Sequence, residues 1–343
     1  MTLRPGHLLA APDKFRGTAG APAVASAAAG AARALGWSAD EAPMADGGEG
    51  TLEAVGGAER RSVVPGPLGS AVEAPWRMVD GAPGGGPTAV IEMARAAGRE
   101  LLPNPTGDQP VRADTAGVGH LVRAAVAAGA RRIVVAAGGS ATTDGGWGAV
   151  SVLGSAAALD GAELVVACDV TTRFVEAAAV FGPQKGATVA QVHELTDRLA
   201  SLADRYRRRF GVDVSALPGG GAAGGLAGGL AALGARLVPG FDLIAELVGL
   251  PGRLAGADLV VTGEGRLDRP SFAGKVVGGV VALVAGRVPV LCVVGSADPG
   301  LDLPGPPGAV RVLSLEDRAG PRRARAETVA LVGEAVTAFL STT

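Results

Sequence analysis

The sequence of 343 residues contains few aromatic residues, few histidines and cysteines, and almost no net charge. Aromatic residues make up only 3% of the chain, so a core has to be built from Ala, Val and Leu, within the 48% of residues that are hydrophobic. The three histidines follow no metal-ligand spacing. A formal charge of −2 gives no electrostatic reason to bind nucleic acid or an anionic membrane.

The chain also lacks long hydrophobic runs and paired cysteines. Cys168 and Cys292 each lie in an apolar run, which predicts buried free thiols and a reducing compartment. The longest uncharged stretch, residues 214–235, contains Pro218 and many glycines and is too weakly apolar for a bilayer helix. We expect no secretory signal. Together these absences predict a soluble cytoplasmic protein that binds neither membranes nor nucleic acid.

What the chain does contain is an alternation of short Val/Leu/Ile runs with longer Ala-rich amphipathic runs, which is typical of α/β layers around a parallel sheet. The clearest predicted strands are residues 8–11, 41–44, 132–136, 163–168, 258–262, 288–294 and 310–314. The predicted helices are residues 21–35, 118–128, 191–209, 241–254, 275–285 and 325–340.

Residues 63–98 interrupt this alternation, because they are rich in Gly and Pro and contain two short predicted strands, 73–79 and 89–93. The length of the chain also favours two domains. We predict that the first two and the last three strands form one five-stranded sheet in a discontinuous domain of residues 1–65 and 241–343. Residues 66–240 would form an inserted α/β domain.

Charged residues and glycines gather in five clusters, most of which follow predicted strands. They are residues 11–17 (APDKFRG), 44–51 (MADGGEGT), 138–146 (GGSATTDGG), 167–171 (ACDVT) with 181–187 (FGPQKGA) behind it, and 262–268 (TGEGRLD). Open α/β sheets bind ligands at the carboxyl ends of their strands, and glycines let backbone N–H groups approach a ligand closely. One Asp-Gly pair is most simply a turn, but five such loops together predict a shared site.

This inventory matches the needs of phosphoryl transfer. Carboxylates hold Mg²⁺ and orient the attacking hydroxyl, while cations and backbone amides stabilise the charge on the transferred group. The candidate cations are Lys14, Arg16, Lys185, Arg266 and Lys275. No G-x-x-x-x-G-K-[ST] motif occurs, which argues against a P-loop kinase.

One G-x-G-x-x-G pattern is present, at Gly219, Gly221 and Gly224, where a helical run begins. It follows no convincing strand and has no acidic residue at the ribose position, so it is a poor dinucleotide fingerprint. A phosphate-binding helix start and tight helix packing are both open interpretations. Ser140 is in no G-x-S-x-G context, which argues against a serine nucleophile.

In their order and spacing the five clusters resemble the motif set of the type I glycerate kinases, from residue 11 to about residue 294. The most specific matches are residues 44–51, 181–187 and 262–268. The chain departs from the family pattern where Lys14 and Arg16 replace a usual Ser and Lys, and where Thr143 replaces a common Asn.

The resemblance implies two three-layer α/β domains, one flavodoxin-like (Rossmann-like) and discontinuous and the second inserted in it. In a 2-1-3-4-5 sheet the first and third strands are neighbours, so the loop at residues 13–17 should lie beside the loop at 263–268. The implied activity is phosphorylation of D-glycerate with ATP and Mg²⁺ in the cleft between the domains. The 2-phosphate is the favoured product over the 3-phosphate.

The resemblance and the clusters together assign roles to individual residues. The implied ligands of Mg²⁺ and of the nucleotide phosphates are Asp46, Asp169 and Glu264. The implied catalytic residues are Asp144, Asp268 and Lys185, with one of the two aspartates as the base. The implied substrate-binding residues are Arg16, Lys14, Ser140 and Arg266. The implied phosphate-binding glycines are Gly47, Gly48, Gly219, Gly221 and Gly224.

Two alternative functions are open. A kinase of another small hydroxy acid or sugar acid would differ in the loops that depart from the family. A catalytically silent ligand-binding protein on the same fold is the second alternative, because a fold does not determine a function. The five acidic loops argue against a silent protein. The sequence leaves open which carboxylate is the base, and also the oligomeric state, for which a homodimer is one option.

Overall fold

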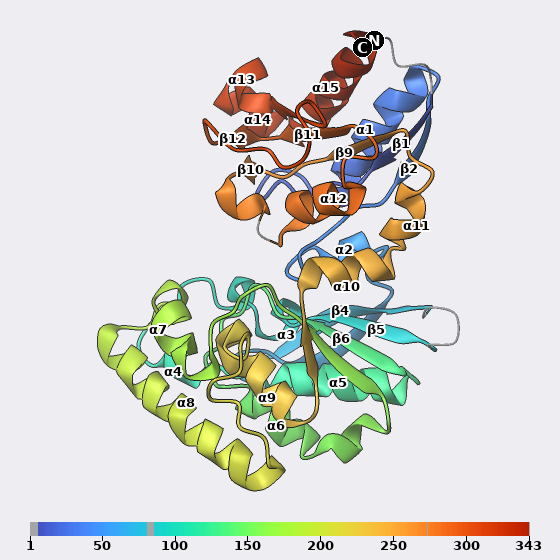
Figure 1. Ribbon diagram of the computed structural model, residues 1–343. Coiled ribbons are helices and arrows are strands. Elements are labelled where there is room, and N and C mark those ends of the chain that lie inside the picture. Colours follow the sequence, from blue (N-terminus) through green and yellow to red (C-terminus); the bar gives the residue numbers. More distant parts are fainter. Residues whose placement is uncertain (1–5, 81–85, 273, 343) are drawn as a thin grey trace. The chain divides into compact units, whose positions relative to one another are not determined.

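The structure is a computed structural model that describes residues 6–80, 86–272 and 274–342. The chain divides into two compact units (Figure 1). Unit 1 comprises the residues up to 46, residues 53–56 and those from 241 onwards, and unit 2 comprises residues 47–52 and 57–240. No helix in the described residues is long and apolar enough to cross a membrane.

Unit 1 is built on a parallel five-stranded sheet in the order β13-β11-β9-β1-β2. Its strands are β1 (His7–Ala10), β2 (Ser38–Glu41), β9 (Leu259–Thr262), β11 (Val290–Val294) and β13 (Val310–Ser314). In chain order this is the 2-1-3-4-5 arrangement, with β1 paired to β9. The predicted five-stranded sheet and the predicted α/β class are both confirmed.

Both faces of this sheet are covered, which explains why its inner strands are mostly apolar. Side chains alternate between two cores: Leu8 and Ala10 lie in one and Leu9 in the other, and each core packs against a different set of helices. The remaining elements of unit 1 are two short strands and several helices. They are α1 (Ala21–Ala34), α10 (Gly240–Leu247), α11 (Leu250–Leu254), β10 (Arg266–Leu267), η6 (Arg269–Phe272), α12 (Val276–Val284), β12 (Ser296–Ala297), α13 (Leu315–Ala319), α14 (Pro321–Ala326) and α15 (Thr328–Thr342).

Two predictions for unit 1 differ from the structure. The second strand lies at Ser38–Glu41 rather than 41–44, because an edge strand with exposed or half-buried side chains carries no apolar signal. The predicted helix at 241–254 is two helices, α10 and α11, separated where Gly249 adopts a φ of 66°. A positive φ costs glycine little, so the chain turns there without strain.

Unit 2 is built on a six-stranded mixed sheet in the order β3-β4-β5-β6-β7-β8. Its first pairings, β3–β4 and β4–β5, are antiparallel, and the rest are parallel. The strands are β3 (Arg60–Pro65), β4 (Ala71–Val79), β5 (Thr88–Glu92), β6 (Arg132–Ala136), β7 (Glu163–Ala167) and β8 (Arg236–Val238). β3, which lies within the predicted segment 1–65, belongs to this sheet. The division into separately folding domains stays a prediction.

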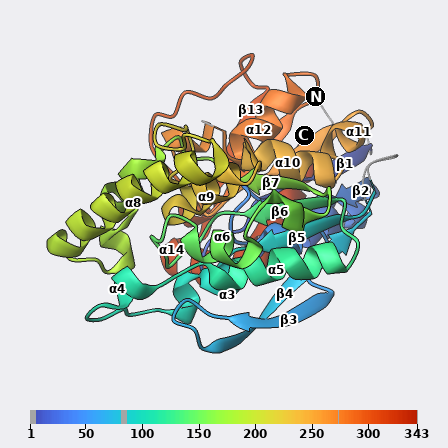
Figure 2. The ribbon, with the colours of Figure 1, turned by 90° about the horizontal axis from the view of Figure 1, so that it is seen from below.

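The helices of unit 2 enclose one aliphatic core with Phe174 and Tyr206 inside it. The long helix α8 lies to one side of the sheet (Figure 2). The helices are α3 (Ala94–Ala97), η1 (Arg99–Leu101), α4 (Gln109–Arg112), α5 (Ala116–Ala127), α6 (Trp147–Leu153), η2 (Ala156–Leu159), η3 (Phe174–Glu176), α7 (Ala177–Phe181), η4 (Pro183–Lys185), α8 (Val189–Phe210), η5 (Ala222–Gly225) and α9 (Leu226–Ala232). A further short helix, α2 (Thr51–Ala54), contains residues of both units.

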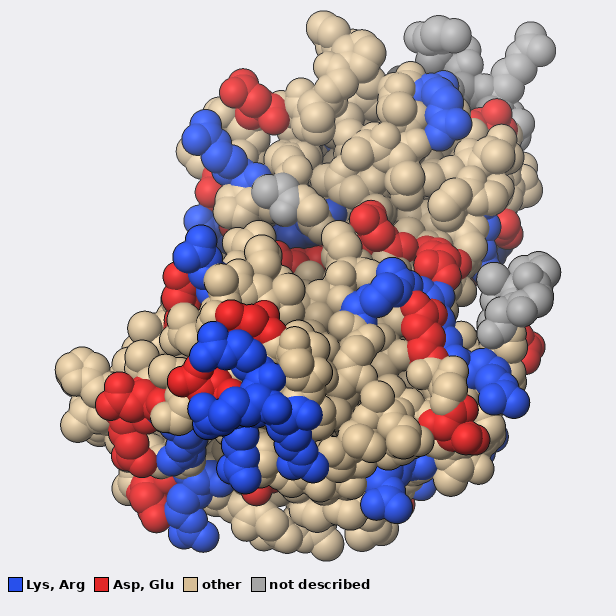
Figure 3. All heavy atoms as spheres, turned by 60° about the horizontal axis from the view of Figure 1, so that its bottom comes forward, with Lys and Arg blue, Asp and Glu red and all other residues tan. Residues whose placement is uncertain are grey.

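The surface carries charges of both signs, as the near-zero net charge requires (Figure 3). The basic run at the end of α8 is exposed, and Arg207 pairs with Asp204 there at 2.8 Å. The two cysteines are free thiols, of which Cys292 is buried and Cys168 is partly exposed. Burial raises the pKa of the Cys292 thiol to about 12, so this thiol stays protonated at neutral pH.

Candidate active site

The loops that follow β1 and β9 meet at the carboxyl edge of the unit 1 sheet. The Asp13 backbone N–H donates to the Gly263 carbonyl at 2.9 Å. A Cβ atom at Gly265 would lie 3.2 Å from the Arg16 backbone nitrogen, so the two loops pack closely. This contact confirms the predicted neighbourhood of loops 13–17 and 263–268, and the neighbouring strands β1 and β9 are its cause.

These two loops and Asp46, which follows β2, form an acidic group in unit 1. The group consists of Asp13, Asp46, Glu264 and Asp268, with Lys275 near enough to interact electrostatically with Asp13 and Glu264. Burial raises the pKa of Asp13 to about 6, against the opposing effect of Lys14. Burial also raises the pKa of Glu264 to about 7. These carboxyls therefore change charge near neutral pH, where an acid or base in phosphoryl transfer would work.

The fit of this group to a divalent cation has two aspects. Among the described residues no three His, Cys, Asp or Glu side chains lie close enough to form a complete metal cage. Mg²⁺ does not need one, because it usually keeps several waters and takes one or two carboxylates together with substrate phosphates. Glu264 Oε1 is buried without a hydrogen-bond partner, so it is an oxygen that lacks a cation or a proton donor. The acidic group therefore fits Mg²⁺ that is held by one or two carboxylates together with waters and substrate phosphates.

Asp268 and Arg266 already have partners in unit 1. Asp268 Oδ1 accepts hydrogen bonds from the Ser271 backbone N–H at 3.0 Å and from its hydroxyl at 2.9 Å. The exposed Arg266 guanidinium donates to Asp298 Oδ1 at 2.9 and 3.2 Å. Of the other two cations predicted to bind substrate, Arg16 is exposed and Lys14 is half-buried.

Unit 2 holds a different kind of carboxylate, Asp144, which is 6% exposed. Its oxygens accept four hydrogen bonds. The donors are the Thr115 backbone N–H (3.0 Å) and hydroxyl (2.8 Å) and the backbone N–H groups of Gly146 and Gly148 (3.0 Å each). Burial raises its pKa, and these donors oppose that rise. Asp144 therefore ties the loop at 138–146 to the beginnings of α5 and α6.

Lys185 is buried close to Asp144, with 6% of its surface exposed. Its ammonium donates to the Thr142 carbonyl at 2.5 Å and lies 5.9 Å from the centre of the Phe181 ring. Burial lowers its pKa to about 7, which Asp144 opposes and Arg99 reinforces. Two residues predicted to be catalytic, Lys185 and Asp144, therefore lie near each other within unit 2, and Lys185 bonds the loop at 138–146.

The loop that contains Gly47 and Gly48 is positioned by Glu92, a residue that sequence reasoning missed. Glu92 is 1% exposed, and its Oε1 accepts the backbone N–H groups of Gly50 at 3.0 Å and Leu52 at 2.9 Å. The loop also requires glycine: Gly47 has a φ of 78°, and a Cβ there would lie 2.8 Å from Ala167 Cβ. A charged residue at the end of an apolar strand was the available signal.

In the structure Gly219, Gly221 and Gly224 make close backbone contacts, and their phosphate-binding role stays a prediction. The Gly221 backbone N–H donates to the Thr172 carbonyl at 3.0 Å. A Cβ atom at Gly224 would collide with the Thr142 carbonyl oxygen, and one at Gly221 would lie 2.5 Å from a backbone oxygen. These glycines allow segments of backbone to pack closely, which is the packing interpretation of the motif.

The remaining predicted site residues of unit 2 lie at the carboxyl ends of its parallel strands. Asp169 follows β7 and is exposed, and its Oδ1 accepts the Gly240 backbone N–H at 2.7 Å. Ser140 follows β6, is 8% exposed and forms a β-bridge with Gly98. In unit 1, Asp46 is half-buried and raises the pKa of Asp13. Asp13 is a second residue to which the sequence analysis assigned no role, although it lies in the cluster at 11–17.

Comparison with known proteins places this geometry in a family. The model of the glycerate kinase family matches residues 8–160 and 152–341. The chain belongs to the glycerate kinase family. A glycerate 2-kinase from Escherichia coli is 38% identical over 292 residues, which are 74% of this chain and 75% of that protein. A glycerate kinase from Bacillus subtilis is 37% identical over 328 residues, which are 84% of this chain and 85% of that protein.

The fold of this family member also has a solved counterpart. The crystal structure of a glycerate kinase 2 from Salmonella typhimurium LT2 is similar with a TM-score of 0.81 and 33% identity, and the match covers 99% of this chain and 98% of that one. The chain is therefore an enzyme, a kinase of the glycerate kinase family, and the sequence-based recognition of the family is confirmed.

Proposed function

We propose that this enzyme transfers the γ-phosphoryl group of ATP, in the presence of Mg²⁺, to a hydroxyl of D-glycerate, and that 2-phosphoglycerate is favoured over 3-phosphoglycerate. The observation that carries the proposal is the acidic group at the carboxyl ends of β1 and β9, with its raised pKa values and its neighbouring lysine. Family membership supports glycerate as the acceptor, and the relative named glycerate 2-kinase supports the 2-phosphate.

The proposed roles of the carboxylates differ with their surroundings. Asp46, Asp169 and Glu264 are the proposed ligands for Mg²⁺ and organisers of the nucleotide phosphates, each as a single carboxylate rather than as part of a cage. When bound, Mg²⁺ supplies charge neutralisation on the phosphate oxygens. Asp144 is proposed to position its loop, because four donors already occupy its oxygens.

The proton of the attacking hydroxyl needs an acceptor. We assign this role to Asp13, because its pKa of about 6 makes it ionised yet basic at neutral pH. Asp268, held by Ser271, orients the hydroxyl. The oxygen–hydrogen bond breaks as the proton moves to Asp13, the oxygen bonds to the γ-phosphorus, and ADP leaves. Lys185 and Arg16 are proposed to stabilise the transferred phosphoryl group and the glycerate carboxylate. Further proposed contributors to substrate binding are Lys14, Arg266 and Ser140. The backbone at Gly47 and Gly48 is proposed to lie near the nucleotide phosphates.

The test is a panel of acceptors assayed for ADP release with and without magnesium. D-glycerate, tartronate, lactate and aldonic acids are each supplied with ATP, and phosphorus NMR identifies the product. We expect magnesium-dependent ADP release with D-glycerate and a 2-phosphate resonance. Release with another acid in place of glycerate would support the related kinase activity instead. No release with any acid would contradict the proposal.

A further inference from the structure

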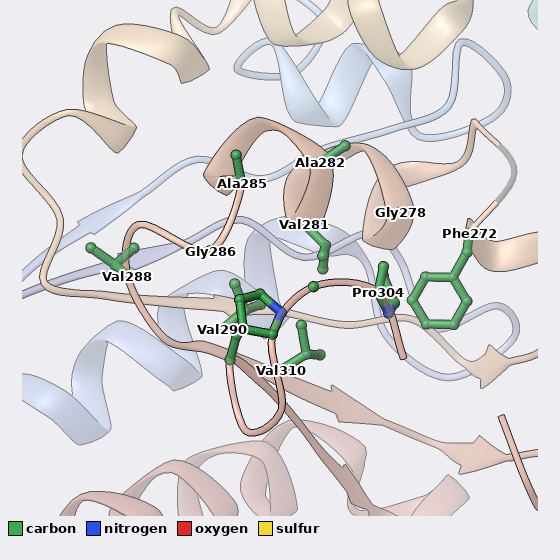
Figure 4. A pocket seen from close by; sticks show the side chains of 13 residues that line it. Phe272, Gly278, Val281, Ala282, Ala285, Gly286, Val288, Val290, Pro304 and Val310 are labelled. Atoms are coloured by element: carbon green, nitrogen blue, oxygen red, sulfur yellow. The ribbon is translucent and has the colours of Figure 1, made fainter. Parts of the chain in front are cut away.

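Unit 1 contains a cavity that none of the assigned residues lines. It lies beneath α12 and has a volume of about 350 Å³ (Figure 4). Its walls are formed by apolar side chains and glycines, and none of the 13 lining residues carries a charge. Val281 points from α12 toward Val310 on the opposite wall (Figure 4).

The cavity has an identifiable origin in the topology. β11 and β13 are parallel neighbours, and a connection between parallel strands is usually a helix that packs on the sheet. Here the residues from 298 to 309 form no helix, and this Pro- and Gly-rich coil passes beside α12. The coil fills less space than a helix would. The cavity is left between the coil, α12 and the first residues of the two strands, Val290 and Val310.

The two ends of the cavity differ. Pro306 closes one end over Gly286, where a Cβ would lie 3.1 Å from the proline ring. Phe272 lies at the other end, and a Cβ at Gly278 would be 2.6 Å from its Cα. The residue before Phe272 is Ser271, whose hydroxyl bonds Asp268. Phe272, at this end of the cavity, is therefore the chain neighbour of a residue that bonds a member of the acidic group.

A ligand that matches these surroundings has an uncharged flat part and an anionic part. The uncharged walls of the cavity accept the uncharged part of the ligand. Lys275, which precedes α12 at the Phe272 end, favours the anionic part. A volume of about 350 Å³ is at the small end of the roughly 300–1,000 Å³ of small-molecule pockets, which suits a purine base better than a larger ligand. Phe272 offers an aromatic ring on which a base can stack.

We propose that this cavity binds the adenine base of the phosphoryl donor, with the triphosphate directed toward Lys275 and the acidic group. The proposal rests on the proposed use of ATP and adds the position of its base. The base would then lie between α12 and the coil at 298–309, on the face of the sheet rather than only at its carboxyl edge.

A direct test is photolabelling of the full chain with 8-azido-ATP, followed by identification of the labelled peptides. We expect label within residues 272–290 or 304–310, and we expect excess ADP to prevent it. Label confined to peptides of other regions would overturn the proposal.

A second test measures binding by calorimetry with three probes: ADP, adenosine and inorganic tripolyphosphate. Val281→Phe puts a ring into the cavity and should weaken ADP and adenosine at least about tenfold, while tripolyphosphate changes by less than about twofold. The control is Val329→Phe, the same substitution at a valine of α15 that is 39% exposed in the same unit. Unchanged ADP binding in folded Val281→Phe would contradict the proposal.

Phe272→Leu covers the case in which Val281→Phe fails to fold, because leucine retains apolar volume and removes only the aromatic face. We expect ADP to bind about tenfold more weakly. The outcomes also separate this inference from the proposed function. If the wild-type enzyme phosphorylates glycerate with ATP but neither variant affects ADP binding, only the base site is wrong. If ATP supports no phosphorylation of glycerate, the proposed function itself fails.

Discussion

The two units differ in the number of hydrogen-bond donors that surround their buried carboxylates. In unit 2, Asp144 and Glu92 are nearly inaccessible, and each accepts several hydrogen bonds from backbone N–H groups of the loops around it. In unit 1, Glu264 has an oxygen without a partner, and burial raises the pKa values of Glu264 and Asp13 toward neutrality. A carboxylate with enough donors holds structure together, whereas one without them is available to a proton or a cation.

The largest effect is expected from Asp144→Ala. The change leaves buried donors of Thr115, Gly146 and Gly148 unpaired and removes the nearby partner of the Lys185 charge. We expect unit 2 to lose at least about 3 kcal/mol of unfolding free energy. Urea unfolding followed by circular dichroism measures this loss. Asp197→Ala, at an exposed position of α8, is the control and should change stability by less than about 0.5 kcal/mol. An Asp144 variant of normal stability would show that the carboxylate does not hold this unit.

Lys185→Met should separate catalysis from stability. The substitution removes a buried charge and retains apolar volume, so the melting temperature should not fall, while kcat should drop about 10²-fold if the ammonium stabilises the transferred group. Because the pKa of Lys185 is about 7, the ammonium is lost as the pH rises through this value. The wild-type kcat should therefore contain an alkaline decline near pH 7 that depends on Lys185. Near-normal turnover in the variant would remove Lys185 from the mechanism.

Glu92 tests whether a positioning carboxylate affects the glycine loop at 47–52. Glu92→Ala removes the acceptor of the Gly50 and Leu52 amides and should cost about 2 kcal/mol. Glu92→Gln retains an acceptor and loses only the charge toward Arg95, so it should cost about 1 kcal/mol and recover part of the activity. Thermal unfolding and steady-state kinetics of both variants provide the comparison. Equal losses in the two variants would mean that the charge, rather than loop positioning, matters.

The smallest expected effect is a pH-dependent change in stability caused by Glu264→Gln. The folded-state pKa of Glu264 is raised to about 7 from 4.5, so the folded chain binds more protons than the unfolded chain between these values. Stability is therefore lost as the pH rises through this range, and the loss is complete above about pH 7. Removing the titration should stabilise the protein by on the order of 1 kcal/mol at pH 8 and have little effect at pH 4. Thermal unfolding at both pH values measures this difference, and an equal effect at both would contradict it.

Several features of the fold were predictable because they depend on local pattern. The strand at 132–136 matches β6 because both of its faces are buried and its residues after Arg132 are apolar. The helix predicted at 191–209 corresponds to α8, whose buried leucines recur at helical spacing. β3 was missed because it is an antiparallel strand with largely exposed side chains, and such a strand resembles a polar loop in sequence.

The candidate site was predictable only in part. Family resemblance and glycine-rich spacing located the loops, since a loop that needs positive φ or close backbone approach leaves glycines in the sequence. The same signal is ambiguous at Gly219, Gly221 and Gly224, because close approach to another backbone segment requires glycine as much as approach to a phosphate does. Glycine content alone cannot distinguish the two.

The α/β class, the five-stranded sheet and the family could be recognised before folding is considered, because they follow from apolar periodicity and from motif spacing along the chain. Which carboxylates have hydrogen-bond donors, and which do not, depends on the folded chain. Two of the four donors to Asp144 belong to Thr115, 29 positions away, and Glu92 binds amides 40 and 42 positions away. The pKa of a carboxyl depends on such donors and on burial, and neither can be read from its neighbours in the chain.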